Sequence, residues 1–286
     1  MATLQPKTKQ EILNDISNGI LNNYLEGMSG LCRLSTKEFN KYLKQADANK
    51  SGDFAMFHYI HALIYTAQHK YEDAHGKYVA ALRINSSNVA ILNNYATLLI
   101  DLCRYDKAFE IVNKLMKLYN LNGDVTINSL IRLSVRTLNT SYLDEISEGK
   151  VTPEIYQTKL KLCEQIIALK RDIQEIGISN EEYTEYFEFL SKFVLNETNQ
   201  TFHPRFTIDN GLDGQLNIEV FLDINSKEVS YLDSEFRSLY LDYIFDNERQ
   251  NLLGKFVVFF RQKKNRYDGT DNLDALYLGM NKELVA

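Results

Sequence analysis

The fold is decided by the stretch from Asp53 to Asn120, which reads DFAMFHYIHALIYTAQHKYEDAHGKYVAALRINSSNVAILNNYATLLIDLCRYDKAFEIVNKLMKLYN. Its residues repeat at an interval of 34. The matched pairs are Ala62 and Ala96, Tyr71 and Tyr105, Ala74 and Ala108, and Ala81 and Leu115. An interval of about this length holds two helices and two turns. The stretch therefore predicts two successive helical hairpins.

With this interval and these small residues, the chain resembles the tetratricopeptide (TPR) repeat family over about residues 53–140. The unit of that family usually ends in proline, whereas Ser86 and Asn120 stand at those places here. A weaker third unit would begin near Gly123, because Asn128 follows Asn94 at the same interval. The resemblance implies an α-helical TPR-like solenoid whose groove holds another protein or a peptide. The alternative is a plain pair of helical hairpins without a groove.

The resemblance also implies which side chains line that groove, namely inner positions on the first helix of each unit. The expected partner-binding residues are Tyr59, Leu63, Asn93, Asn94, Thr97, Asp101 and Asn128. Side-chain amides can donate to and accept from the backbone of an extended peptide. The alternative is that Asn94 and Asn128 bond only within the helices or to water. Tyr59 and Leu63 replace the Lys and Asn of TPR proteins that clamp a carboxylate, so only Asn94 matches that clamp.

Two helices are predicted on the N-terminal side of the repeats. Isoleucine recurs every four residues from Ile12 to Ile20 within a helix over residues 7–27. Ser35 and Glu38 have the spacing of a capping box, which predicts a second helix from residue 36 to about residue 48. This helix pair is either a degenerate repeat or an N-terminal cap of the stack.

Two long helices are predicted after the repeats. Pro153 is typical of a first helical turn, and an apolar stripe recurs every seven residues from Ile155 onward. The stripe lasts only about three heptads, which favours an ordinary helix pair within the chain over a coiled coil. The second helix of the pair is predicted over residues 180–195, with Ser179 or Asn180 as its cap.

The hydrophobic period changes after a polar run at residues 196–201, which predicts a domain boundary. The predicted organisation is a TPR-like helical domain over residues 1–196 and a small α+β domain over residues 202–286. Strands are predicted over residues 205–208, 216–224 and 255–261, a helix over residues 225–245, and a last short helix over residues 271–284. The order β-β-α-β is typical of a helix laid on a short sheet. We recognise no family in this second domain.

Composition and charge favour a cytoplasmic protein that needs neither a membrane nor a metal or cofactor. Hydrophobic residues make up 44% and charged residues 24%, a mix typical of globular chains. No apolar run approaches the length of about 18 residues that a membrane span needs, and the N-terminus lacks the apolar core of a signal peptide. Three dispersed cysteines fit a reducing compartment. A net charge of −6 disfavours nucleic acid as a partner.

The residue types for acid–base chemistry occur together in the second domain. Glu219 and Asp223 share one strand face, with His203 and Arg205 predicted across a hairpin. Such a group could act on a phosphodiester. The favoured alternative is the solvated face of a half-buried strand, where alternation already requires polar residues.

Two other clusters have a structural alternative that we favour. His58, His61, His69 and His75 lie close in sequence, but no further ligand follows at metal-binding spacing, so surface or core histidines are favoured. Lys263, Lys264 and Arg266 follow the last strand and could contact nucleic acid, but a solvated strand end is favoured.

Together these features predict a non-catalytic adaptor rather than an enzyme. The helical domain would capture a protein or peptide, and the α+β domain would bind a second partner or form a homodimer through the last strand, which contains Phe259 and Phe260. One alternative is that the α+β domain is a small nuclease or toxin-like enzyme carried by the TPR arm. Another is an immunity or antitoxin-type inhibitor, which would bind one enzyme.

Overall fold

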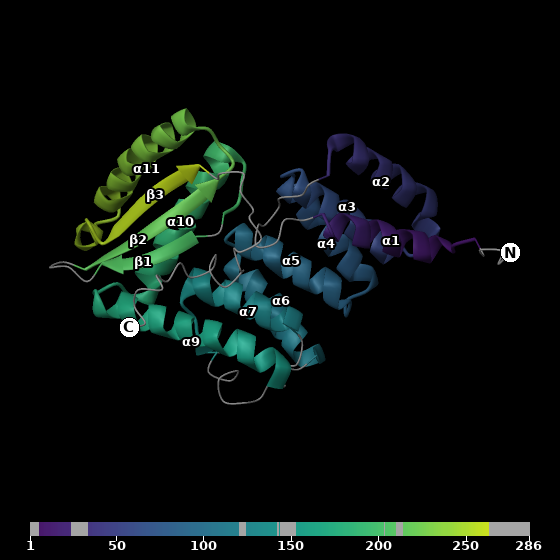
Figure 1. Ribbon diagram of the computed structural model, residues 1–286, viewed down its shortest axis with the longest axis horizontal. Helices are drawn as coiled ribbons and strands as arrows, with labels where there is room; N and C mark the ends of the chain where they lie inside the picture. The colour runs from purple at the N-terminus through teal and green to yellow at the C-terminus, as the bar shows by residue number, and fades with distance from the viewer. Residues whose placement is uncertain are drawn as a thin grey trace. The chain divides into compact units, whose positions relative to one another are not determined.

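The computed structural model describes residues 6–23, 34–119, 124–141, 143, 153–202, 204–209 and 214–262. Over these residues the protein is mostly helical, with a small three-stranded sheet in its C-terminal part (Figure 1). The chain divides into two compact units. Unit 1 comprises Met1–Leu99 and Asp106–Asn120, and unit 2 comprises Ile100–Tyr105 and Leu121–Ala286. No helix in the described ranges is long and apolar enough to cross a membrane.

Unit 1 is built from helices. They are α1 (Lys9–Leu21), α2 (Thr36–Asn49), α3 (Phe54–Ala67), α4 (Tyr71–Ile84), most of α5 (Val89–Asp101) and most of α6 (Tyr105–Tyr119), with the short 3-10 turn η1 (Lys50–Gly52) before α3. Helix α1 packs against α2 and α3, and α3 packs along α4. The predicted capping box of Ser35 and Glu38 is confirmed, because each side chain bonds the backbone N–H of the other residue.

The repeat seen in the sequence recurs in the backbone. Helices α4 and α6 begin at the matched residues Tyr71 and Tyr105. Two residues before each start, the chain turns through a left-handed residue, His69 with φ 58° and Cys103 with φ 55°. The Tyr71 hydroxyl lies 2.7 Å from His69 Nδ1, and the Tyr105 hydroxyl donates to Cys103 Sγ at 3.4 Å. The two matched positions therefore share a turn geometry as well as a residue pattern.

The small residues of the repeat lie in the interior, where close helix packing requires them. Ala62, Ala74, Ala96 and Ala108 are fully buried. Large side chains fill the space around them, and Tyr59 and Tyr78 face each other with ring centroids 6.2 Å apart. These contacts establish packed helices, whereas a TPR-type solenoid stays a prediction. The second helix of the weaker third unit would fall around residues 142–146, and of these the structure describes Leu143 alone.

Unit 2 combines helices with the sheet. Its elements are α7 (Asp124–Thr137), α9 (Pro153–Glu175), α10 (Asn180–Thr198), β1 (Pro204–Asp209), β2 (Gln215–Leu222), α11 (Ser226–Asp246), the 3-10 turn η3 (Gln250–Leu252) and β3 (Phe256–Gln262). The predicted order β-β-α-β is confirmed. Strand β2 is central, pairing antiparallel with β1 and parallel with β3. Helix α11 makes the crossover between the parallel strands. The last predicted helix, residues 271–284, lies outside the described residues.

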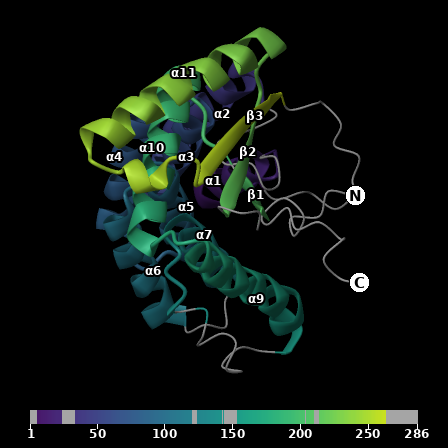
Figure 2. The same cartoon turned by 90° about the vertical axis from the view of Figure 1, so that its left-hand side faces the viewer.

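One face of the sheet is covered by α10 and α11 (Figure 2). Alternate residues of β2 are buried on this face, as their spacing predicts. The rings of Tyr186 and Phe256 stack at 3.8 Å, and Phe193 and Phe236 both lie against Phe260. Aromatic side chains from α10, α11 and β3 therefore pack together in the core of this unit.

The grouping of helices differs from the boundary predicted at residues 196–202. Contacts place α7, α9 and α10 in the same unit as the sheet. The reason lies in the face of α10 that carries Tyr183, Tyr186 and Phe187, because these rings pack on the strands. Helix α10 also runs through the polar stretch to Thr198 and ends at Asn199, which has φ 53°.

Candidate functional site

Two of the expected partner-binding residues lie inside unit 1. Tyr59 and Leu63 are each only 1% exposed. The Tyr59 hydroxyl accepts a hydrogen bond from Asn94 Nδ2 at 2.8 Å, and burial raises the pKa of the phenol. Asn94 Nδ2 also donates to the Ala90 carbonyl at 2.9 Å. The amide nitrogen of Asn94 is thus engaged within the unit, which matches the alternative weighed from sequence.

An accessible, uncharged stripe runs along α5. It consists of Ala90, Asn93, Asn94 and Thr97, and we call it the α5 stripe. Ala90 is exposed and the other three are half-buried. The spacing of three and four residues places them on one side of the helix. The structure therefore brings together three of the seven predicted residues on one helix face.

Asp101 and Asn128 belong to unit 2. Asn128 is half-buried on α7. Asp101 is buried at the end of α5, and this burial raises the pKa of its carboxyl to about 6, although Arg132 and Arg136 act in the opposite direction. An interior carboxyl cannot line an open groove. The structure therefore gives Asp101 no exposed position from which to contact a partner.

Arg136 organises a buried polar cluster that the sequence analysis missed. Its guanidinium donates to Ser191 Oγ at 3.5 Å and to the Phe202 carbonyl at 2.5 Å. The same group lies over the rings of Phe187 and Phe202, at 4.8 and 4.9 Å. A buried charge needs such partners. No local pattern marks this arginine, because its two hydrogen-bond partners belong to α10 and to the segment after it, far along the chain.

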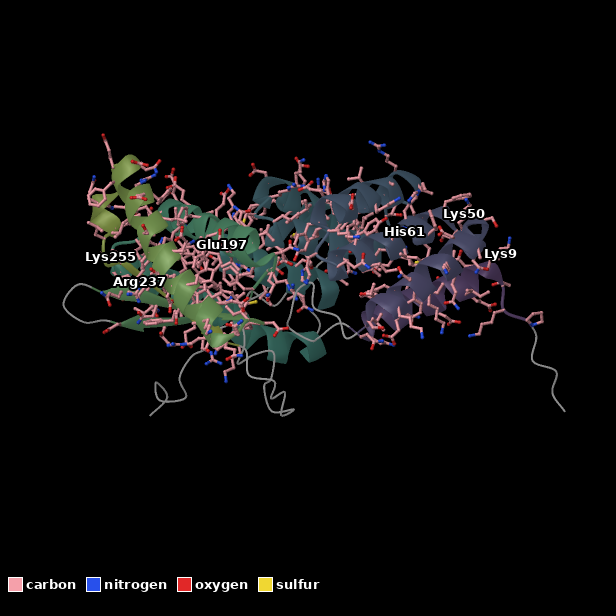
Figure 3. The ribbon with its side chains drawn as sticks, turned by 90° about the horizontal axis from the view of Figure 1, so that it is seen from above. Lys9, Lys50, His61, Glu197, Arg237 and Lys255 are labelled. Atoms are coloured by element: carbon pink, nitrogen blue, oxygen red, sulfur yellow. The ribbon has the colours of Figure 1, made fainter. Side chains whose placement is uncertain are left out.

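The histidines of unit 1 behave as half-buried packing residues. Burial lowers the pKa of His58, His61 and His69. His61, which is labelled in Figure 3, lies with its Nε2 3.6 Å from Asp47 Oδ1 on α2. Among the described residues, no group of three or more His, Cys, Asp or Glu side chains could hold a metal ion.

The acidic residues considered for catalysis are not gathered into a reactive group. Glu219 on β2 pairs with Arg205 of β1 at 3.6 Å and with Arg261 of β3 at 3.3 Å. Asp223 lies past the end of β2 and is exposed. His203 lies outside the described residues, as do Lys263, Lys264 and Arg266. A carboxylate held between two guanidinium groups is suited to fixing strands rather than to transferring protons.

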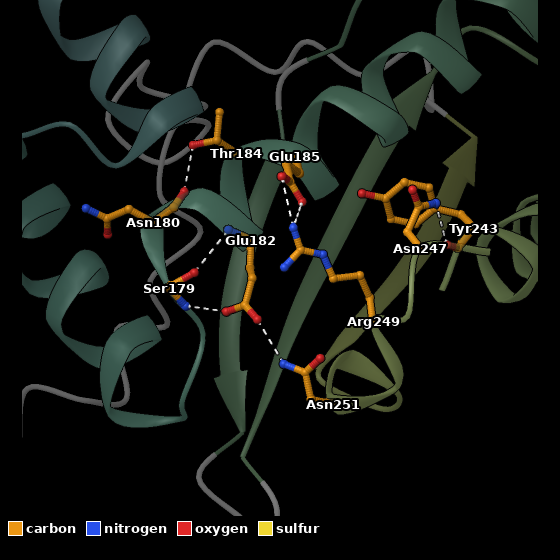
Figure 4. A network of polar contacts seen from close by, with 9 residues as sticks. All are labelled: Ser179, Asn180, Glu182, Thr184, Glu185, Tyr243, Asn247, Arg249 and Asn251. Carbon is orange, nitrogen blue, oxygen red and sulfur yellow. Dashed lines mark hydrogen bonds and ion pairs between the residues drawn. The ribbon is translucent and has the colours of Figure 1, made fainter. Parts of the chain in front are cut away.

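A polar network joins the start of α10 to the segment after α11 (Figure 4). Ser179 caps α10 in a capping box with Glu182, as predicted for its cap. Glu182 also accepts from Asn251 at 2.8 Å. Arg249 donates two hydrogen bonds to Glu185, at 2.9 and 3.1 Å. Charge-assisted pairs of this geometry hold a surface segment in one place.

In β3, the strand predicted to form a homodimer contact, one outward-facing backbone N–H group is already hydrogen-bonded. The N–H of Phe260 in β3 donates to Asp233 Oδ1 of α11 at 3.3 Å. This contact uses a donor that lies on the side of β3 away from β2, and a side chain from a covering helix is one way to protect a sheet edge.

Comparison with known proteins yields no relative. No family model, no curated protein and no solved structure matches the chain.

Proposed function

We propose that the protein is a non-catalytic adaptor whose unit 1 is a TPR-like repeat that captures a protein or peptide along the α5 stripe. The observation that carries the proposal is the regular recurrence of tyrosine-led helices, left-handed turns and buried alanines. Repeated hairpins of this kind make extended binding surfaces. The dispersed cysteines of the chain fit a cytoplasmic location.

The chemistry of the α5 stripe suits an extended peptide. Amide and hydroxyl groups both donate and accept, which matches the alternating groups of a peptide backbone. Asn94 is fixed by Tyr59 and Ala90. Direct contact with the partner is assigned to Asn93 and Thr97, which are half-buried and four residues apart on the same face.

The proposal is tested by purifying the tagged full-length chain from its source cells with its bound proteins. We expect the double variant Asn93→Asp with Thr97→Asp to recover the partner at a level reduced on the order of tenfold, because two new charges would be desolvated in the complex. Circular dichroism should show unchanged helicity, since both positions are accessible.

The matched control is Thr36→Asp with Asn40→Asp. These residues have the same types and the same spacing, are exposed, and lie on α2 of the same unit. The control should recover the partner at the wild-type level. Equal recovery by both double variants would rule out the α5 stripe as the contact surface.

In this proposal unit 2 binds a second partner. Self-association through β3 is less favoured, because Asp233 occupies the N–H of Phe260. The nuclease alternative finds no support in the position of Glu219, which is engaged by two arginines. An immunity-type inhibitor would use the same surfaces, and a single enzyme recovered at equal stoichiometry would identify it.

A further inference from the structure

Exposed apolar side chains concentrate on α11 and just after it. Tyr231, Leu241 and Phe245 are 53%, 45% and 58% exposed. The inward face of the same helix is buried through Leu232, Phe236, Tyr240 and Ile244. Helix α11 therefore carries apolar groups on its outward side as well as on the side that covers the sheet. Leu241 and Phe245 are one helical turn apart, and neighbouring exposed apolar groups mark interaction sites more often than single exposed residues do.

The outward residues follow a heptad pattern. Tyr231, Ser234, Ser238, Leu241 and Phe245 are separated by alternating steps of three and four, and all five are exposed. We call this set the α11 stripe. Steps of three and four keep side chains on one seam along a helix. The two central serines are small, so a partner helix could approach closely between apolar residues at both ends.

A column of acidic residues runs along one side of the α11 stripe. Glu235, Asp242 and Asp246 lie on this flank, given the helical period of 3.6 residues. Within the described part of the chain, none of the three forms an ion pair. The other flank carries the basic residue Arg237 (Figure 3). The charge beside the seam is therefore one-sided and negative.

The exposed end of α11 is held in place rather than fraying. Ile244, next to Phe245, is fully buried. Asn247 caps the helix end by donating its side-chain N–H to the Tyr243 carbonyl at 2.8 Å. The two hydrogen bonds from Arg249 Nη2 to the Glu185 carboxylate then fix the following segment to α10 (Figure 4). Leu241 and Phe245 are thus presented on a rigid element, which reduces the entropy lost on binding.

We infer that the α11 stripe is a docking surface for an amphipathic helix of a partner protein, with an apolar seam flanked by lysine or arginine. The inference rests on the proposed adaptor function. It specifies the chemistry of the second partner, which unit 2 would bind. Apolar residues of the partner helix would pack between Tyr231 and Phe245, and its basic flank would face Glu235 and Asp242. Complementary charge beside such a seam sets partner choice and orientation.

A second copy of the chain fits this surface poorly. In a symmetric antiparallel pair of α11 helices the acidic columns would lie beside each other and repel. In a parallel pair, Arg237 and, near the start of the helix, Lys227 would oppose the carboxylates of the acidic column. The one-sided charge therefore favours a different, basic helix over self-pairing.

The test uses the full-length chain and two labelled synthetic helices of about three heptads. Both have leucine along the seam, and the flank carries lysine in one and glutamate in the other. Fluorescence anisotropy at low salt should show the lysine peptide bound at least about tenfold more tightly. The variant Leu241→Ser with Phe245→Ser should lose this binding by a similar factor, and Glu235→Lys with Asp242→Lys should reverse the preference.

Leu253→Ser is the matched control, because Leu253 is 44% exposed in the same unit but lies off the stripe. It should bind the lysine peptide like the wild type. Equal binding of both peptides, or binding insensitive to the Leu241 and Phe245 changes, would overturn the inference. So would a homodimer in light scattering that the same changes abolish. The variant Asn93→Asp with Thr97→Asp should bind the lysine peptide like the wild type. A failure of the role proposed for the α5 stripe can therefore be distinguished from a failure of this inference.

Discussion

At the scale of single residues, Asp101 couples the stability of its unit to pH. Burial raises the pKa of its carboxyl from 3.8 to about 6. Between these values the folded protein keeps a proton that the unfolded chain has released. The contribution of Asp101 to folding therefore becomes less favourable as pH rises from about 4 to about 6, and stays constant above that.

Replacing Asp101 with asparagine should remove this dependence. The free energy of unfolding of Asp101→Asn, relative to wild type, should increase by about 3 kcal/mol between pH 4 and pH 7, since each pKa unit corresponds to about 1.4 kcal/mol. Urea unfolding at the two pH values measures it. Asp106→Asn, at an exposed position five residues later, is the control. A difference that does not change with pH would contradict the assignment of a buried, protonated Asp101.

Two tyrosines on α10 give opposite predictions for the same substitution. Both are fully buried, but the Tyr183 hydroxyl donates to the Val135 carbonyl at 2.7 Å. The Tyr186 hydroxyl has no hydrogen-bond partner within the described residues. Tyr183→Phe should lower the free energy of unfolding by about 1–2 kcal/mol, whereas Tyr186→Phe should raise it by about 1 kcal/mol. Thermal or urea unfolding of the pair, side by side, decides between these signs.

At the scale of elements, the sequence predicts those helix starts and buried strand faces that depend on residues close together in the chain. The capping box at Ser35 begins α2 at the predicted residue, because the cap and its partner Glu38 are three residues apart. Alternation likewise predicts β2 and its buried face. Both patterns depend only on residues that are close together in the sequence.

The residues that sequence could not place depend on distant contacts. The resemblance places Tyr59 in a groove, but this side chain packs against Tyr78 and accepts a hydrogen bond from Asn94, which belongs to a different helix. Asp101 is interior, within the field of Arg132 and Arg136. Periodicity tells which side of a helix is apolar, but it does not tell which of several neighbours will cover that side. The α5 stripe was therefore predicted only in part.

The junction between α9 and the sheet depends on a glycine. Gly214 precedes β2 with φ +56°, and a Cβ atom there would lie 2.6 Å from Ile176 Cγ2. Gly177 also has positive φ, +80°, but a Cβ there would meet nothing within 4 Å. Gly177→Ala should cost about 1–2 kcal/mol through backbone strain alone. Gly214→Ala should cost about 1–3 kcal/mol more, because Ile176 must also move. Equal costs in urea unfolding would show that the two elements are not packed this closely.

At the scale of the whole molecule, the two units should respond to acid in opposite ways. In unit 1, burial lowers the pKa of His58, His61 and His69 below the usual 6.5. The unfolded chain then binds protons that the folded unit does not, so the stability of unit 1 falls as pH drops below about 6.5. Asp101 in unit 2 has a raised pKa, and its contribution improves over part of the same range.

Hydrogen exchange on the full-length chain can separate these effects. Between pH 7.5 and pH 5.5, corrected for the intrinsic exchange rate, protection should fall in α3 and α4 more than in α7 and α10. His61→Gln should reduce the loss in α3, because burial lowers the pKa of the His61 imidazole, with Lys77 and His58 acting in the same direction and Asp47 against them. His61 is the side chain to change first, since both of its ring nitrogens are buried without a hydrogen-bond partner among the described residues. An equal loss of protection in both units would mean that burial of these histidines does not govern the acid response. It would also mean that the histidines are packed more loosely in unit 1 than the contacts of α3 indicate.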